Sequence, residues 1–195
     1  MLTLVWDVDD VLNRLMFDWF TAVWKPDHPD CSLDYSDIRE NPPHNLLGAP
    51  KSEYLSSLDA FRLSERGRAM RPNPLALDWL WRHGPSCRHM VLTARPLESA
   101  PHVSEWVFRH FGNYVRSVAV VPPRLNPGVP EYDRTKEDYL RWFGRAQILI
   151  DDCPDAIQAA KRLGMRGLLY PQPWNTEPRS EAGAMAQLTA WVDND

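Results

Sequence analysis

Short apolar runs rich in β-branched residues recur along this chain, and most of them end at polar or acidic residues. Runs of this length without a polar face are typical of strands buried on both sides in a parallel sheet. Helical patterns lie between them, and strands that alternate with helices imply right-handed crossover connections. The sequence therefore predicts an α/β fold, a Rossmann-like doubly wound parallel sheet of about five strands. The predicted strands are Leu2–Trp6, His89–Thr93, Ser117–Val121, Gln147–Asp151 and Gly167–Tyr170.

The predicted helices have recognisable ends. Residues 74–84 and 154–164 each begin with proline and end with glycine, which is the usual preference at helix ends. Residues 135–138, Thr-Lys-Glu-Asp, have the form of a capping box that starts a helix running to Phe143-Gly144.

One segment interrupts the alternation of strands and helices. After the first strand, an amphipathic aromatic stretch at residues 16–24 is followed by a region with five prolines and no strong strand pattern. We predict a small helical cap, residues 14–71, inserted into a core formed by residues 1–13 and 72–195. A second irregular loop is expected at Pro122–Pro130. Long insertions in compact domains usually act as lids or binding elements.

Charge and cysteine content argue against several classes of partner. The 195 residues include 22 Lys and Arg and 26 Asp and Glu, which gives a formal net charge of −4, and no basic run occurs. A nucleic-acid duplex or an anionic membrane surface selects clustered basic residues, so neither is expected as a partner. The three cysteines are widely spaced and fit neither a disulfide framework nor a zinc site. The chain shows no export signal or membrane span, and we expect a soluble, cytoplasmic protein.

Carboxylates gather where the predicted strands end. The carboxyl ends of parallel strands meet at one edge of the sheet, where ligands bind in open α/β folds. Carboxylates this close repel one another unless a cation or a lysine neutralises them. Oxygen ligands suit Mg²⁺, whose coordination is commonly completed by a substrate phosphate, so the pattern indicates phosphoryl chemistry. The residues expected to converge are Asp7, Asp9 and Asp10 after the first strand, Thr93 and Arg95 after the second, Lys136 before the fourth, and Asp151, Asp152 and Asp155 at its end.

The same residues resemble a known family. In chain order, Asp7-Val-Asp9-Asp-Val-Leu, the strand ending at Thr93, Lys136 and the Asp151-Asp152 pair are similar to the four motifs of the haloacid dehalogenase superfamily. The resemblance covers the predicted core from residue 2 to about residue 170. It implies a Mg²⁺-dependent phosphomonoesterase that works through an aspartyl-phosphate intermediate.

The resemblance also implies a role for each motif residue. Asp7 would be the nucleophile that attacks phosphorus. Asp9 would be the general acid for the leaving oxygen and then the base for water. Thr93 would hydrogen-bond a phosphate oxygen, and Lys136 would neutralise the crowded oxyanions. Asp152 would join Asp7 and the Asp9 carbonyl around Mg²⁺.

Three positions depart from the usual family pattern. Asp10 stands where glycine is common, Val11 where threonine is common, and Ala156 where a second late carboxylate often occurs. None of these changes removes a catalytic group. The late metal ligand stays open between Asp151 and Asp152, with Asp155 a weaker candidate, and we favour Asp152 because it aligns with the ligand position of the commonest late motif.

Within the superfamily, the chain most resembles the 5'(3')-deoxyribonucleotidase-like branch. The resemblance rests on the helical insertion and on three strings, Thr93-Ala-Arg-Pro96, Ile148-Leu-Ile-Asp-Asp152 and Pro171-Gln-Pro-Trp-Asn175. It implies that the substrate, a small phosphorylated molecule, is a (deoxy)nucleoside monophosphate. The alternatives are a phosphatase of another small phosphomonoester, such as a sugar phosphate, and a non-catalytic phosphoryl-binding or interaction module.

Three further residues are candidates for substrate binding. Arg95 is expected either to bind the substrate phosphate or to pair with a surface carboxylate. Phe17 and Trp24 lie seven residues apart, on one face of an α-helix, and are expected either to stack on a nucleobase or to pack in the cap.

Overall fold

The chain forms one five-stranded parallel sheet. We describe it from a computed structural model that covers residues 1–125 and 127–194, so Asn126, in the predicted 122–130 loop, and Asp195 lie outside the described residues. The strands are β1 (Thr3–Trp6), β2 (Arg88–Thr93), β3 (Val115–Val120), β4 (Ile148–Asp151) and β5 (Arg166–Leu169), in the order β3-β2-β1-β4-β5. The predicted Rossmann-like doubly wound sheet is confirmed, and each strand lies within two residues of its expected position.

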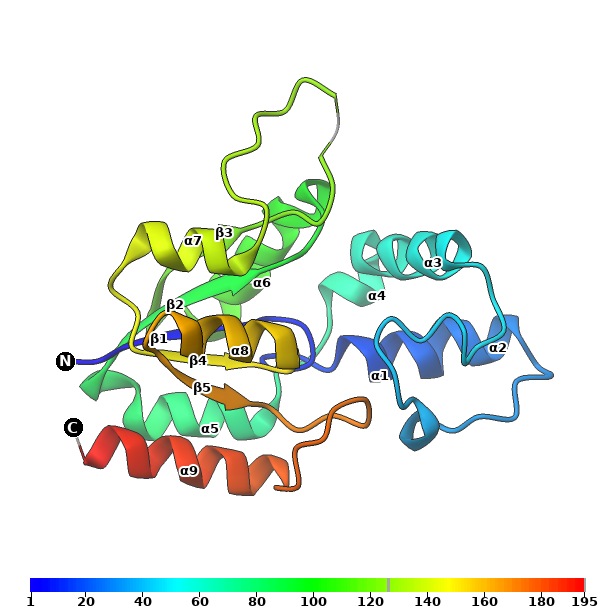
Figure 1. Ribbon diagram of the computed structural model, residues 1–195. Helices are drawn as coiled ribbons and strands as arrows, with labels where there is room; N and C mark the ends of the chain where they lie inside the picture. The colour runs from blue at the N-terminus through cyan, green and yellow to red at the C-terminus, as the bar shows by residue number, and fades with distance from the viewer. Residues whose placement is uncertain (126, 195) are drawn as a thin grey trace.

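Helices cover both faces of this sheet (Figure 1). Leu4 and Trp6 of β1 pack with the helices at residues 74–83, 100–111 and 181–193, whereas Val5 packs with those at residues 136–143 and 154–162, because successive side chains of a strand point to opposite faces. Among the described residues, no helix is long and apolar enough to span a membrane. The helices of the core are α5 (Pro74–His83), η3 (Gly84–Ser86), η4 (Leu97–Ser99), α6 (Ala100–Phe111), α7 (Lys136–Phe143), α8 (Pro154–Arg162) and α9 (Glu181–Asp193).

The predicted capping box fixes the start of α7. The Thr135 hydroxyl accepts a hydrogen bond from the Asp138 amide at 3.2 Å, and the Asp138 carboxylate accepts one from the Thr135 amide at 3.0 Å. Gly144 ends the helix in the left-handed conformation, with φ of 63°. These contacts place Lys136 in the first turn of α7, at the carboxyl edge of the sheet.

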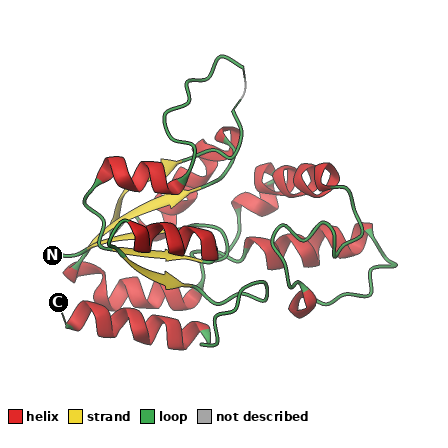
Figure 2. Cartoon of the chain, in the orientation of Figure 1, coloured by secondary structure: helices red, strands yellow, loops and turns green. Residues whose placement is uncertain are grey.

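A helical insertion, residues 15–68, lies between β1 and α5 and contains no strand (Figure 2). It has its own hydrophobic cluster, which includes Trp19, Phe20 and Phe61 and is separate from the clusters on the two faces of the sheet. Its helices are α1 (Leu15–Trp19), η1 (Phe20–Trp24), α2 (Lys25–Asp27), η2 (Tyr35–Asp37), α3 (Lys51–Leu63) and α4 (Glu65–Arg68).

α1, η1 and α2 follow one another without a break, and the middle stretch, η1, is π-helical. Because a π-helical turn is wider than an α-helical turn, residues on either side of it no longer keep α-helical register. Trp24 is therefore 1% exposed within the insertion core, where its ring stacks on His28, while Phe17 is 41% exposed with its ring edge against Tyr35. The expectation that Phe17 and Trp24 share a face is wrong for this reason.

Candidate active site

The strand order brings Asp7 and Asp151 side by side. From β1 the chain continues through β2 and β3 on one side and returns to β4 on the other, which makes the carboxyl ends of β1 and β4 the switch point of the sheet. The Asp7 amide donates to the Ile150 carbonyl at 2.9 Å. Asp7 lies two residues after Val5, and Asp151 lies two residues after Leu149. The side chains of Val5 and Leu149 both pack toward α7 and α8. Both carboxylates thus lie on the side of the sheet where α7 begins.

Lys136 joins these two carboxylates. Its Nζ lies 2.9 Å from Oδ1 of Asp7 and 2.6 Å from Oδ2 of Asp151. The remaining oxygen of Asp151 accepts a hydrogen bond from the Cys153 amide at 3.0 Å. Burial alone would lower the pKa of Lys136, but the carboxylates of Asp151 and Asp7 raise it above its ordinary value, so the lysine stays charged.

Asp152 has different partners from Asp151. Its Oδ2 accepts a hydrogen bond from the indole Nε1 of Trp174 at 2.8 Å, and its Oδ1 accepts none from the described part of the chain. Oxygens of Asp7, Asp151 and Asp152 lie within 4.8 Å of one another, and all three residues are buried. Burial raises the pKa of Asp7 to about 7, and burial together with the charge of Asp151 raises that of Asp152 well above its ordinary value.

This donor set fits a divalent cation. Lys136 pairs with only two of the three buried carboxylates, and a cation would relieve the remaining repulsion among them. Both oxygens of Asp151 already have protein partners, whereas one oxygen of Asp152 accepts no hydrogen bond from residues 1–125 or 127–194. The Asp9 carbonyl also accepts no hydrogen bond within the described residues. All of these donors are oxygens, which is the ligand type that Mg²⁺ prefers.

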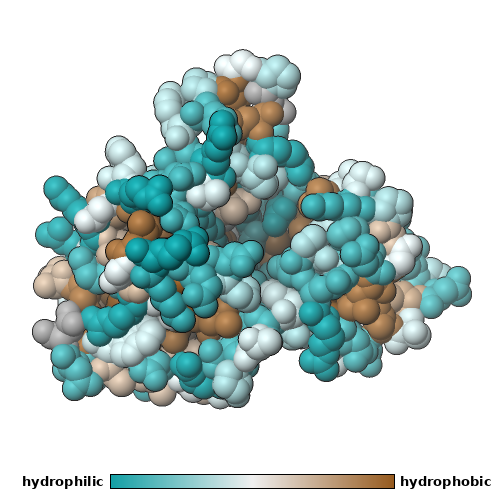
Figure 3. Space-filling view, in the orientation of Figure 1, coloured by the Kyte–Doolittle hydropathy of each residue, from teal (hydrophilic) through white to brown (hydrophobic). Residues whose placement is uncertain are grey.

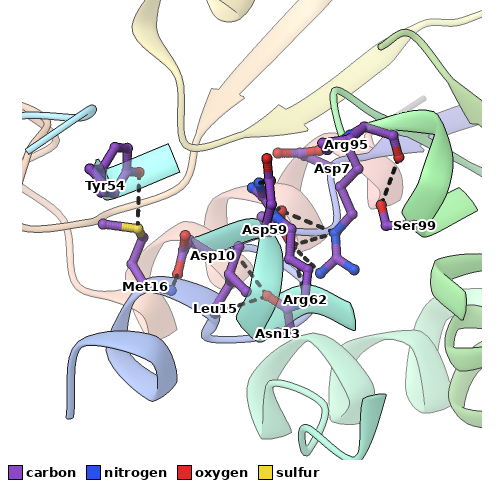
Figure 4. A network of polar contacts seen from close by, with 12 residues as sticks. Asp7, Asp10, Asn13, Leu15, Met16, Tyr54, Asp59, Arg62, Arg95 and Ser99 are labelled. Atoms are coloured by element: carbon purple, nitrogen blue, oxygen red, sulfur yellow. Dashed lines mark hydrogen bonds and ion pairs between the residues drawn. The ribbon is translucent and has the colours of Figure 1, made fainter. Parts of the chain in front are cut away.

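Two arginines hold the side chain of Asp9, and Figure 4 labels both of them, Arg62 and Arg95. Nε of Arg95 donates to its two oxygens at 3.0 and 3.1 Å, Nη2 of Arg95 donates to Oδ1, and Nη2 of Arg62 lies 3.1 Å from Oδ2. Burial alone would raise the pKa of Asp9, but the charges of Arg95 and Arg62 lower it to about 2. Asp9 is therefore a carboxylate in this arrangement, and Arg95 pairs with a carboxylate of the site rather than with one on the surface.

Sequence reasoning missed two of the residues around Asp9. Arg62 reaches the site from α3 of the insertion, where its Nη1 also donates to Asp59 at 2.8 Å. No local pattern signals an arginine 53 positions from its partner. Asn13 donates to Asp9 at 3.3 Å, and its Oδ1 accepts hydrogen bonds from the amides of Asp10 and Leu15. An asparagine just before a helix is a recognisable capping signal, so the role of Asn13 at the start of α1 could have been predicted from the sequence.

Asp10 adopts the backbone conformation that glycine usually takes. Its φ is 61°, and its Oδ1 accepts a hydrogen bond from the Met16 amide in α1 at 3.0 Å. Asp and Asn tolerate this left-handed region better than most residues because their short side chains can hydrogen-bond locally. The side chain is buried, and burial together with the charge of Asp152 raises its pKa well above the ordinary value.

A cavity of about 500 Å³ lies between the core and the insertion. The core contributes the carboxylates, Lys136 and Thr93, whose hydroxyl makes no hydrogen bond with the described residues. The molecular surface is hollowed between these two parts (Figure 3). Phe17 and Trp24 do not line the cavity. The side chains that the insertion contributes are Leu15, Met16, Asn41, Tyr54, Leu58 and Arg62.

Comparisons with known proteins point to one group of folds. No family model matches the chain, and no curated protein matches it in sequence. A haloacid dehalogenase-like hydrolase from Streptococcus pneumoniae superposes with a TM-score of 0.62 at 13% identity, over 98% of both chains. A subfamily IA haloacid dehalogenase hydrolase from Geobacter sulfurreducens superposes with a TM-score of 0.53 at 12% sequence identity, over 96% of both chains. YfnB from Bacillus subtilis, described as a HAD-hydrolase and bound to magnesium, superposes with a TM-score of 0.55 at 13% sequence identity, over 98% of both chains.

The chain has the haloacid dehalogenase fold. At these identities the likeness concerns the fold alone. It agrees with the superfamily resemblance of the sequence motifs, but it does not support the 5'(3')-deoxyribonucleotidase-like branch. Asp7, Thr93, Lys136 and Asp152, one from each of the four motif-like segments, line one cavity at the carboxyl edge of the sheet.

Proposed function

We propose that this chain is a Mg²⁺-dependent phosphomonoesterase that uses Asp7 as its nucleophile. The observation that supports the proposal is the group formed by Asp7, Lys136, Asp151 and Asp152, whose charged atoms meet at the switch point of the sheet beside a cavity. Asp7, Asp152 and the Asp9 carbonyl would hold the ion, and Asp151 would hold Lys136. When bound, Mg²⁺ would supply charge stabilisation to the phosphoryl oxygens.

In the first half-reaction, a carboxylate oxygen of Asp7 attacks phosphorus and the bond from phosphorus to the leaving oxygen breaks. The leaving oxygen takes a proton from Asp9, which yields an alcohol and an aspartyl-phosphate. In the second half-reaction, water attacks phosphorus and gives its proton to Asp9, and the bond to Asp7 breaks to release phosphate. Lys136 and the Thr93 hydroxyl stabilise charge on the phosphoryl oxygens throughout.

The contacts of Asp9 hold it deprotonated. As a carboxylate it has the protonation state that the second half-reaction needs, but Arg95 and Arg62 occupy both of its oxygens and keep its pKa at about 2, so it accepts a proton from water only when one of these contacts is lost. To carry a proton to the leaving oxygen, it has to lose at least one of these guanidinium contacts. Because Arg62 belongs to the insertion, a shift of the insertion during substrate binding would break such a contact. The insertion would thus act as the cap of the site and exclude water from it.

The cavity supports a small substrate. Its volume of about 500 Å³ lies within the range of small-molecule sites. The leaving group would lie against Leu15, Tyr54 and Leu58, of which Tyr54 supplies an aromatic ring. We propose a (deoxy)nucleoside monophosphate as the first substrate class to test and a sugar phosphate as the second. Tyr54, rather than Phe17 or Trp24, is the ring that such a substrate would meet.

The test is phosphate release from a panel of nucleoside, deoxynucleoside and sugar monophosphates, with Mg²⁺ and with chelator. We expect release only with the metal, and a loss to background in Asp7→Asn, because an amide is neither a nucleophile nor an anionic ligand. Asp27→Asn, at an exposed position, is the matched control and should keep full activity.

The preferred member of the panel decides between nucleotidase and sugar phosphatase. Release that persists in Asp7→Asn would overturn the proposed nucleophile. No release from any member would contradict the enzymatic proposal and favour the phosphoryl-binding module, for which a bound phosphomonoester should still be detectable by calorimetry.

A further inference from the structure

The loop after β5, residues 172–175, contacts both the candidate metal site and the insertion. Trp174 donates from its indole Nε1 to the Asp152 carboxylate at 2.8 Å, and the Asn175 side chain donates to the Asp152 carbonyl at 2.9 Å. The Gln172 side chain donates to the Asp10 carbonyl at 2.6 Å. Residues 172–175 therefore contact both acidic segments of the site, the one after β1 and the one after β4.

The same loop contacts the insertion. The hydroxyl of Tyr35, in η2, donates to Oε1 of Gln172 at 3.1 Å, and the rings of Tyr35 and Trp174 meet edge to face with centroids 6.3 Å apart. Burial raises the pKa of the Tyr35 phenol, so the hydroxyl remains a donor. One short loop thus links an aromatic residue of the insertion to the carboxylate that would hold the ion.

We propose that Trp174 is a positioning residue that orients Asp152 for the metal ion, and that Tyr35 makes this orientation depend on the docking of the insertion. The proposal deepens the proposed function, since it rests on the Mg²⁺ site described there. An indole N–H can only donate, so it engages one oxygen of Asp152 and leaves Oδ1 available. Partners of this kind fix the direction of a ligand, and their loss typically weakens metal binding by about 10- to 100-fold.

The coupling to the insertion has a reciprocal consequence. If a docked insertion strengthens metal binding through Tyr35 and the loop, then metal binding must strengthen docking by the same factor. Amides of the insertion around residues 35–38 should therefore exchange more slowly with solvent when Mg²⁺ is present. This readout does not depend on turnover.

The first experiment measures Mg²⁺ affinity by titration calorimetry on the full chain. For Trp174→Phe, which keeps a ring but loses the donor, we expect the Kd for Mg²⁺ to rise by about 10- to 100-fold. Trp81→Phe is the matched control, because Trp81 is 70% exposed on α5. The Kd of this variant for Mg²⁺ should equal that of the wild type. Turnover of Trp174→Phe should return to the wild-type value at saturating Mg²⁺, which a general loss of structure would not allow.

The second experiment removes one oxygen from the insertion. Tyr35→Phe should raise the Kd for Mg²⁺ by about 3-fold, as expected for one ordinary hydrogen bond, and should abolish the Mg²⁺-dependent slowing of exchange at residues 35–38. This variant also serves as the test should Trp174→Phe fail to fold.

The outcomes separate the two proposals. Wild-type affinity in Trp174→Phe would overturn the positioning role of Trp174 while the Mg²⁺ site stands. Wild-type affinity in Tyr35→Phe with the exchange effect intact would overturn the coupling of Asp152 to the insertion. Absence of Mg²⁺ binding to the wild-type chain would overturn the Mg²⁺ site and the positioning role together.

Discussion

Asp10 shows how one residue can satisfy two demands that conflict. Its φ of 61° favours glycine, whereas the amide of Met16 at the start of α1 needs an acceptor, which glycine does not supply. Aspartate meets both demands, but it adds a buried carboxyl group next to Asp152. The departure from the usual family glycine therefore has a local structural cause.

We predict different effects of three substitutions at Asp10. Asp10→Ala should lower the free energy of unfolding by about 2 kcal/mol, because alanine is strained at this φ and the acceptor is lost. Asp10→Gly should be more stable than Asp10→Ala by about 1 kcal/mol, and Asp10→Asn should stay near the wild type. Urea unfolding in chelator measures all three.

Gly144→Ala provides a control for strain alone. Gly144 also has a positive φ, 63°, and a Cβ at this position would meet no atom closer than 3.9 Å. Its cost should be about 1 kcal/mol and purely conformational. Equal stabilities of Asp10→Ala and Asp10→Gly would contradict the role assigned to the backbone conformation.

Asp151 and Asp152 show which features of single site residues the sequence predicts and which it does not. The pair itself is recognisable, since both follow an apolar strand. Their hydrogen-bond partners differ: Lys136, which lies 15 positions before Asp151, contacts Asp151, and Trp174, which lies 22 positions after Asp152, contacts Asp152. No local pattern pairs these side chains, so the partners of the two carboxylates are visible only in the structure.

At the scale of elements, the start of α7 determines where Lys136 lies. Thr135→Ala removes the hydroxyl that caps this helix and should lower the free energy of unfolding by about 1 kcal/mol. Because the same turn carries Lys136, we also expect kcat to fall several-fold. Urea unfolding and phosphate release check the two effects.

Ser180→Ala is the matched control for this cap. The Ser180 hydroxyl accepts a hydrogen bond from the Gly183 amide at 3.1 Å and starts α9, which packs on the face of the sheet opposite α7. Its loss should cost a similar free energy without changing kcat. A fall in kcat of the same size in both variants would show that stability, rather than the position of Lys136, explains the effect.

The sequence predicts elements best where a local signal marks their ends. The capped helix α7 and the apolar strands lie where expected, because caps and buried runs act within a few residues. The π-helical turn at Phe20–Trp24 could not be foreseen, since it changes the register of a helix without changing its composition. The position of Trp24 in the insertion core followed from that turn.

At the scale of the whole molecule, the buried carboxylates link folding to pH. Asp7 has an ordinary pKa of 3.8 and a pKa of about 7 in the folded chain. Between these values the unfolded chain has lost a proton that the folded chain keeps, so raising the pH across this window lowers the contribution of Asp7 to the free energy of unfolding. Lys136 offsets part of this effect but does not remove it.

We therefore predict that Asp7→Asn becomes more stable relative to the wild type as the pH rises from about 4 to 7 in chelator. The relative gain should be on the order of 3 kcal/mol, because an amide does not ionise. Excess Mg²⁺ should make the wild type more stable than Asp7→Asn, since only the wild type keeps the anionic ligand. Thermal unfolding of both proteins across this pH range, with Asp27→Asn as control, provides the measurement.

A pH-independent difference between Asp7→Asn and the wild type would contradict the raised pKa of Asp7. A Mg²⁺ effect of equal size in both proteins would contradict its place in the metal site.

The insertion contacts the proposed catalytic and metal-binding residues, through Arg62 on Asp9 and through Tyr35 on the loop that holds Asp152. Such a segment is not an interchangeable module. Replacing it with another insertion would also remove two contacts of Asp9 and Asp152, so a transplanted insertion has to bring equivalents of Arg62 and Tyr35. If the chain is the phosphatase proposed above, its substrate preference should therefore diverge by single substitutions at cavity positions such as Leu15, rather than by exchange of the whole segment.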